Sequence, residues 1–328
     1  MVFGNSSMKK QIVICVSGGK DSTALYLYAL EEGIDFKAVF ADTGHEHEWT
    51  IDYVNSLHEK TGGPKVETVR RDFPEEMFEK RRTYIREKWP VRWKEWMTQE
   101  KANEVASKLN KTGNPFLDAC FLFGGFPGPL SRFCTDELKI IPLETQCYKP
   151  LIDDGFEVEV WQGIRAAESR KRALMDERST INRDYPKDGF SVEYSIYRPM
   201  LDWNVDQVFE MHSRHGIQAN PLYKWGLTRV GCFPCIYTSK NELKQINKWF
   251  REHIDRVREW ERIVGEIHLK NNATFFSHKN DENKMGIDNM VEWAKTDRGG
   301  GQYLFDDDGF CDVNNPVTLS CSEFGVCE

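Results

Sequence analysis

A short loop between a buried strand and a helix constrains this chain more than any other segment. Residues 11–16 (QIVICV) form a continuous apolar, β-branched run that is typical of a buried strand, and residues 21–32 (DSTALYLYALEE) show helical periodicity. The loop that joins them has the sequence SGGKDST over residues 17–23. Backbone amides and the helix dipole at such a junction attract anions, so the sequence predicts a phosphate-binding loop.

The residue types in this loop suit a phosphate. The glycines permit a tight turn and a close approach of the ligand, the lysine supplies positive charge, and the hydroxyl groups can donate hydrogen bonds. Asp21 is a candidate for holding Mg²⁺. The spacing fits neither a Walker A loop nor G-x-G-x-x-G, and the simpler alternative is a turn that only caps a helix. The candidate nucleotide-binding residues here are Ser17, Gly18, Gly19, Lys20, Asp21, Ser22 and Thr23.

Strands and helices alternate beyond the loop, which predicts an α/β fold with a parallel sheet. Further strands are expected at residues 37–42, 65–70 and 157–164, and helices at about residues 49–60, at 136–147 and from residue 166 onward.

A helical insertion interrupts this alternation. Residues 74–111 are charged, rich in tryptophan and helical in pattern, and residues 115–130 are a loop rich in Gly, Pro and Phe. We interpret both as an insertion of about residues 74–130 within a nucleotide-binding domain of residues 1–201. The rest of the chain, residues 202–328, is expected to be a mostly helical extension.

The extension carries most of the cysteines that suggest metal chemistry. Helices are expected at about residues 203–215 and 240–270, separated by a loop with Cys232 and Cys235 and followed by a cysteine-containing tail. The apolar run at residues 12–16 is too short for a signal peptide or a membrane span, so we expect a cytoplasmic protein without a membrane partner. In such a reducing compartment, nine cysteines favour metal or sulfur chemistry over a disulfide framework.

The loop resembles the SGGKDS signature of the PP-loop ATP pyrophosphatases, which share an adenine nucleotide α-hydrolase-like fold with the sulfonucleotide reductases. Residues 40–46 (FADTGHE) resemble the DTG segment of the phosphoadenosine phosphosulfate (PAPS) reductase family. That resemblance implies that Asp42 lies close to the adenosine, although a turn aspartate is the alternative. Residues 163–170 resemble the family's G-x-R-x-x-E-S stretch and imply that Arg165 meets a phosphate or sulfonate, for which a guanidinium is well suited. A solvated basic turn is the alternative.

Residues 134–143 (CTDELKIIPL) resemble the cysteine segment of the same family. The resemblance implies that Cys134 approaches Cys232 and Cys235, and that these cysteines are ligands of a [4Fe-4S] cluster. Thr135 stands where the family has its fourth cysteine, so we expect the fourth ligand in the tail, at Cys321. A structural Zn²⁺ site and ordinary redox or buried thiols are the alternatives.

The loop keeps the lysine and aspartate of the ATP-cleaving members. We therefore expect an enzyme that binds ATP and Mg²⁺, cleaves ATP at the α-phosphate and adenylates an acceptor, with Lys20, Asp21 and Arg165 as catalytic residues. Sulfur transfer with a sulfur-donor protein would be one use of this chemistry. A sulfonucleotide reductase that releases sulfite from PAPS or adenosine phosphosulfate is the alternative enzyme.

A third hypothesis is a nucleotide-sensing or nucleic-acid-binding module. Basic residues and tryptophans alternate over residues 80–96, a composition that can hold tRNA or DNA, but a solvated amphipathic helix has the same composition. The net charge of −8 does not favour nucleic-acid binding by the whole surface. We interpret four histidines as structural residues without a metal triad: His45, His47, His212 and His215.

Overall fold

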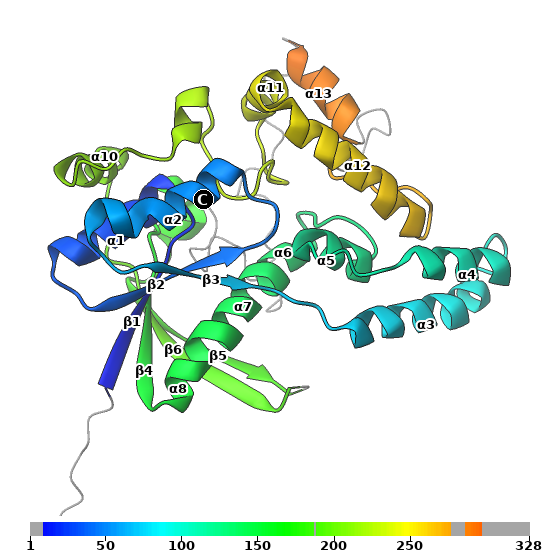
Figure 1. Cartoon of the computed structure of the whole chain (residues 1–328), viewed down its shortest axis with the longest axis horizontal. Coiled ribbons are helices and arrows are strands. Elements are labelled where there is room, and N and C mark those ends of the chain that lie inside the picture. The colour runs from blue at the N-terminus through cyan, green and yellow to red at the C-terminus, as the bar shows by residue number, and fades with distance from the viewer. Residues whose placement is uncertain (1–8, 187, 277–285, 297–328) are drawn as a thin grey trace, which may run out of the picture.

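The protein is described by a computed structural model that covers residues 9–186, 188–276 and 286–296 (Figure 1). A six-stranded sheet has the order β3-β2-β1-β4-β6-β5. Neighbouring strands are parallel except for the β5–β6 pair, which is an antiparallel hairpin. The strands are β1 (Lys9–Cys15), β2 (Phe36–Asp42), β3 (Val66–Arg70), β4 (Phe156–Trp161), β5 (Arg178–Tyr185) and β6 (Phe190–Tyr197). The parallel α/β fold predicted from the alternation is confirmed.

Helices cover both faces of the sheet, which explains why β1 is apolar without alternation. On one face, Ile14 packs in a core with α1 (Lys20–Glu31), α2 (Glu48–Thr61) and α10 (Val205–Arg214). On the other face, Val13 and Cys15 pack against a helical run from residue 133 to residue 153. This run consists of α6 (Phe133–Thr135), a π-helical turn (Asp136–Ile140), α7 (Ile141–Leu143), a second π-helical turn (Glu144–Tyr148) and α8 (Lys149–Asp153).

The insertion and the extension share a separate apolar core, although they are far apart in the sequence. Its buried residues include Phe78 and Trp89 from the insertion and Trp260 from the extension. The helices around it lie to one side of the sheet in Figure 1. They are α3 (Glu75–Arg92), α4 (Gln99–Lys108), α5 (Pro115–Phe123), α11 (Lys240–Trp249), α12 (Arg251–Ile267) and α13 (Ile287–Lys295). The domain boundary at residue 201 stays a prediction.

Several expected elements differ from the structure. The loop predicted at residues 115–130 begins with the helix α5. Asn114 caps its start by accepting the amide of Leu117 at 3.0 Å, and Gly124 caps its end. The strand predicted to reach residue 164 ends at Trp161. The helix predicted from residue 166 is only a 3-10 turn (Ala166–Glu168) followed by the short α9 (Arg170–Ala173).

Two further differences concern the second half of the chain. The single helix predicted over residues 240–270 is divided at Phe250 into α11 and α12. The β5–β6 hairpin was not predicted, although the burial of β6 alternates with the period of two that strands require.

Within the described residues, no helix combines the length and the apolar character that crossing a bilayer requires.

Candidate functional site

The predicted phosphate loop lies at the carboxyl end of the central strand β1, where the chain turns into α1. Gly18 has φ +81°, and a Cβ atom there would lie 2.8 Å from Cγ2 of Thr50. A side chain at this position would therefore be strained by the backbone and would also collide with α2. Gly19 is the residue that precedes the first turn of α1. The glycines thus serve the close turn that the sequence predicted.

The hydroxyl groups hold the shape of the loop. Oγ of Ser22 accepts the amide of Ser17 at 3.1 Å and lies 3.0 Å from Oγ of Ser17. The amide of Thr23 donates to the carbonyl of Gly19 at 3.0 Å. These bonds link the end of β1 to the first turn of α1, so the loop is ordered by its own side chains.

Two cations meet one buried carboxylate at the start of α1. Oδ2 of Asp21 lies 2.7 Å from Nζ of Lys20, and Oδ1 of Asp21 lies 2.5 Å from Nε of Arg165. The Asp21 side chain is fully buried, and that of Arg165 is 6% exposed. Arg165, which the resemblance implied for this site, is thus brought to the loop from beyond the end of β4.

The extension contributes three residues to the loop. The amide of Lys20 donates to the hydroxyl of Tyr223 at 3.0 Å, and Nε2 of His212 donates to the carbonyl of Lys20 at 2.8 Å. Nδ2 of Asn220 donates to the carbonyl of Gly18 at 3.2 Å. Sequence reasoning missed all three as site residues, because each contact is made by a single side chain without a motif around it.

Close packing at the end of β4 leads to a testable expectation. A Cβ atom on Gly163 would lie 3.0 Å from the carbonyl oxygen of Asp21 and 3.1 Å from its carbon, both of which are backbone atoms. We expect Gly163→Ala to lower the free energy of unfolding by about 1–3 kcal/mol, since the loop must shift to admit the methyl group. Urea denaturation would measure this change. Gly128→Ala is the matched control, because a Cβ there meets nothing within 4 Å.

Asp42 ends β2 and is held within its own turn. Its Oδ1 accepts the amide of Gly44 at 2.8 Å, and its Oδ2 lies 2.6 Å from Nη1 of Arg70. Both carboxylate oxygens therefore have protein partners, as expected for the alternative in which Asp42 is an ordinary turn aspartate. A contact between Asp42 and the adenosine stays a prediction.

An open pocket of about 340 Å³ lies beside the loop, along the carboxyl ends of β1 and β2. Ser17 lines it together with Glu46 and Lys139. Burial raises the pKa of Glu46, while hydrogen bonding from Thr43 and the charge of Lys139 lower it. Ligands of parallel α/β sheets bind at this edge, so the pocket is where we expect a nucleotide to extend from the loop.

The Cys232–Cys235 segment packs on the turn after β2. Sγ of Cys232 lies 3.8 Å from Oγ1 of Thr43 and 4.0 Å from Oε1 of Glu46. The amide of Phe233 donates to the carbonyl of His45 at 2.7 Å. These contacts place the cysteine pair at the border of the pocket, next to the loop rather than in a separate domain.

Cys134 lies on the short helix α6, beside the same region. The guanidinium of Arg132 stacks on the ring of Tyr237 at 5.2 Å, which brings the Cys134 segment next to the chain that follows Cys235. Cys134, Cys232 and Cys235 are all partly exposed thiols. Three such donors fit a thiophilic metal or cluster by their chemistry. The fourth predicted ligand, Cys321, lies outside the described residues.

The remaining described cysteines, Cys15, Cys120 and Cys147, are buried. Burial raises the pKa of Cys15 to about 11 and that of Cys147 to about 12. These thiols are therefore protonated at neutral pH and are poor nucleophiles.

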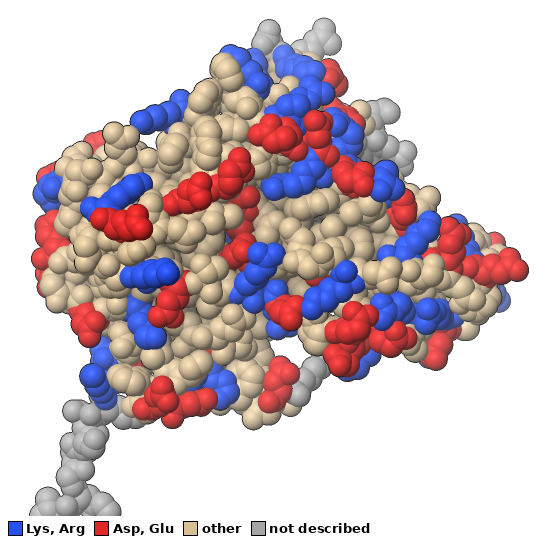
Figure 2. Space-filling view, in the orientation of Figure 1, with Lys and Arg blue, Asp and Glu red and all other residues tan. Residues whose placement is uncertain are grey.

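The basic residues of the insertion are interspersed with acidic ones. Arg82 lies 2.5 Å from Glu75 and 2.8 Å from Glu79. Figure 2 shows the same mixture of both charges over the face that carries α3 and α4. Nucleic-acid binding by this stretch stays a hypothesis.

The chain belongs to the family described as the phosphoadenosine phosphosulfate reductase domain, whose sequence model matches residues 11–238. An uncharacterized 37.8 kDa protein encoded in the gpa 5' region of Escherichia phage 186 is 39% identical over 334 residues, which cover 96% of both chains. Two uncharacterized proteins of Methanocaldococcus jannaschii are 27% and 25% identical. The matches cover 81% and 72% of this chain but 44% of each archaeal protein.

Among solved structures, the phosphoadenylyl-sulfate (PAPS) reductase from Candida auris in its phosphate complex is similar to this chain at 14% sequence identity and a TM-score of 0.39. The match covers 68% of this chain and 82% of that one. Membership of the family rests on the match to its sequence model. The same match confirms the family resemblance from which Arg165 was chosen as a candidate.

Proposed function

We propose that this protein is an ATP pyrophosphatase that cleaves ATP between its α- and β-phosphates and transfers the adenylyl group to an acceptor. The observation that carries the proposal is the pair of cations at the phosphate loop. Lys20, the first residue of α1, and Arg165, which comes from beyond β4, both pair with Asp21. Ser17 of the same loop lines the pocket at the sheet edge. A nucleotide with three phosphates needs two cations at this place, whereas a loop with less positive charge would suit a ligand with fewer phosphates.

In the proposed reaction, an oxygen atom of the acceptor attacks the α-phosphorus. The bond from that phosphorus to the bridging oxygen breaks, and pyrophosphate leaves with the electron pair. The loop amides and Arg165 would stabilise the charge on the α-phosphate, and Lys20 would stabilise the leaving pyrophosphate. Positioning and charge stabilisation of this kind account for most of the catalysis in phosphoryl-type transfers.

The geometry favours a positioning role for Asp21. Both of its oxygens lie within 2.7 Å of a cation, so a Mg²⁺ ion at this carboxylate would have to displace Lys20 or Arg165. We therefore infer that Mg²⁺ enters as part of the substrate, bound by the phosphates of ATP. Asp21 would then hold the two cations in place until the phosphates replace it as their partner.

A test of the proposal uses ATP labelled at the α-phosphate, with Mg²⁺ and with either bulk tRNA or DNA as acceptor. Pyrophosphate release together with labelled AMP or labelled acceptor is the expected result. The polymer that accelerates release would identify the acceptor class and test the predicted nucleic-acid partner. The proposal would be contradicted if pyrophosphate were released under none of these conditions.

The alternative enzyme is a sulfonucleotide reductase, which the position of the cysteines beside the pocket favours. Two thiols would supply two electrons, the sulfonate sulfur would leave as sulfite, and the thiols would end as a disulfide. Incubation with PAPS and a dithiol would release sulfite if this activity is present. Sulfite release without pyrophosphate release from ATP would replace our first proposal with this one.

We also propose that Cys134, Cys232 and Cys235 hold an iron–sulfur cluster, with Cys321 as the fourth ligand. When bound, such a cluster can supply redox chemistry or hold a sulfur atom near the nucleotide. Iron analysis and the visible absorbance of anaerobically purified protein test this assignment. Colourless protein with stoichiometric zinc at the thiols would instead support a structural Zn²⁺ site.

A further inference from the structure

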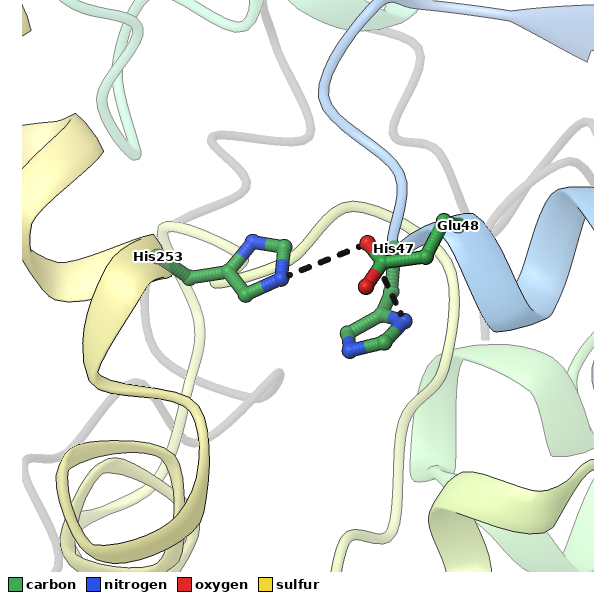
Figure 3. A group of neighbouring side chains, drawn as sticks. All are labelled: His47, Glu48 and His253. Atoms are coloured by element: carbon green, nitrogen blue, oxygen red, sulfur yellow. Dashed lines mark ion pairs between the residues drawn. The ribbon is translucent and has the colours of Figure 1, made fainter.

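Two buried histidines and a glutamate meet where the extension packs on α2. His47 and Glu48 lie at the start of α2, and His253 comes from α12, which is far away in the sequence (Figure 3). Their ligand atoms all lie within 4.8 Å of one another. The side chains of His47 and His253 are 1% and 4% exposed, whereas that of Glu48 is 63% exposed. The group is therefore closed toward the protein and open toward solvent on the carboxylate side.

The nitrogens of His253 are unusual for a buried side chain. Within the part of the chain that the structure describes, neither Nδ1 nor Nε2 of His253 has a hydrogen-bond partner. Buried polar atoms are nearly always hydrogen-bonded, because an unmet donor or acceptor loses its interaction with water without compensation. Figure 3 shows Nε2 of His253 directed at the Glu48 carboxylate, 3.6 Å away. That separation is too long for a hydrogen bond.

We propose that the His47–Glu48–His253 group binds a divalent transition-metal cation, with Zn²⁺ as the expected ion. Ligand atoms about 2.1 Å from a tetrahedral zinc ion lie about 3.4 Å from one another. Oε2 of Glu48 lies 3.6 Å from Nε2 of His253 and 3.5 Å from Nδ1 of His47. These two distances are therefore close to those of atoms that share a metal ion, and all three ligand atoms lie within 4.8 Å of one another.

The chemistry of the donors agrees with this assignment. Imidazole nitrogen with carboxylate oxygen is a common ligand set for Zn²⁺ and related cations. Oε1 of Glu252 lies 3.8 Å from Nε2 of His253 but is not among the three ligand atoms that all lie within 4.8 Å of one another. The carboxylate of Glu48 would balance part of the charge of the cation.

The state of the histidines also favours metal binding. Burial and the charge of Arg256 lower the pKa of His253 to about 4, and burial lowers the pKa of His47. Both rings are therefore neutral at pH 7, and no proton has to leave before a cation binds. The binding has one cost, since Nδ1 of His47 accepts the amide of Trp49 at 3.0 Å and would have to release it.

A cation at this site would connect the extension, which also contacts the phosphate loop, to α2. The rings of His47 and His253 both pack on Phe233, at 4.8 Å and 4.9 Å between ring centroids. Phe233 lies inside the Cys232–Cys235 segment, so a cation here would fix α12 and that segment against α2. This role is structural, and it does not depend on the proposed cleavage of ATP.

The test is zinc binding by the full chain, measured after chelation and dialysis. We expect Glu48→Gln and His253→Phe each to remove one zinc ion per chain or to weaken its binding at least about tenfold. Phenylalanine preserves the aromatic packing of His253, and Glu48 is exposed, so circular dichroism should show that both variants are folded. Glu59→Gln is the matched control, because Glu59 is an exposed glutamate on the same helix, with a side chain 75% exposed.

Cobalt distinguishes this site from the cysteines, because only thiolate ligands give an intense near-ultraviolet charge-transfer band. We expect that band to be the same in Glu48→Gln and in the unmodified protein, while the stoichiometry falls by one ion. Equal zinc stoichiometry and equal affinity in all four proteins would overturn the proposal. In that case the histidines would be ordinary buried residues, as His47 was interpreted from the sequence.

Discussion

Lys20→Ala is expected to lower the rate of pyrophosphate release from ATP by about 10²- to 10³-fold, the usual effect of removing one group that stabilises transition-state charge. The side chain of Lys20, at the start of α1, is 16% exposed and can reach phosphates bound by the loop. Its charge is needed most as negative charge grows on the leaving pyrophosphate. We therefore expect kcat and kcat/KM to fall together rather than KM alone to rise.

The control for this prediction is Lys37→Ala. Lys37 lies on β2, its side chain is 41% exposed, and its Nζ lies 3.6 Å from Oε1 of Glu67. This variant loses a lysine charge from a strand of the sheet without touching the loop, so its pyrophosphate release should be unchanged. If Lys20→Ala were as active as Lys37→Ala, the assignment of the phosphate loop would be wrong.

The parts of the site that the sequence predicted are those with a local signal. The loop could be recognised because an apolar strand, a Ser/Gly-rich turn and a periodic helix follow one another directly in residues 11–32. Gly18 illustrates this, since its φ of +81° is a property that only a glycine accepts easily. Arg165 was placed at the loop only through resemblance, because no pattern around it indicates a contact with Asp21.

What the sequence could not predict are contacts between distant segments. Tyr223 and Asn220 reach the loop through single hydrogen bonds, and nothing in their neighbourhood specifies the partner. Residues 74–111 and 240–270 were expected to be helical, but a helical pattern does not say against what a helix packs. For that reason the shared core of the insertion and the extension, and the meeting of His47 with His253, became visible only in three dimensions.

Loss of the Asp21 carboxylate is expected to lower the free energy of unfolding by about 3–5 kcal/mol, as is usual when one partner of a buried ion pair is removed. Asp21→Ala would leave the guanidinium of Arg165 buried, with Oε1 of Glu168 as a more distant partner at 3.8 Å. Lys20 would lose its 2.7 Å contact as well. Urea denaturation followed by circular dichroism would measure the change.

The matched control is Asp288→Ala, which removes an aspartate from an arginine at the surface. Asp288 lies 2.6 Å from Arg258, but their side chains are 63% and 40% exposed, so its loss should cost only about 0–1 kcal/mol. The double variant Asp21→Ala/Arg165→Met should recover part of the loss, because the uncompensated charge disappears with its partner. If Asp21→Ala cost no more than Asp288→Ala, the carboxylate would not be what holds the two cations of the loop in place, and the positioning role inferred for Asp21 would have to be abandoned.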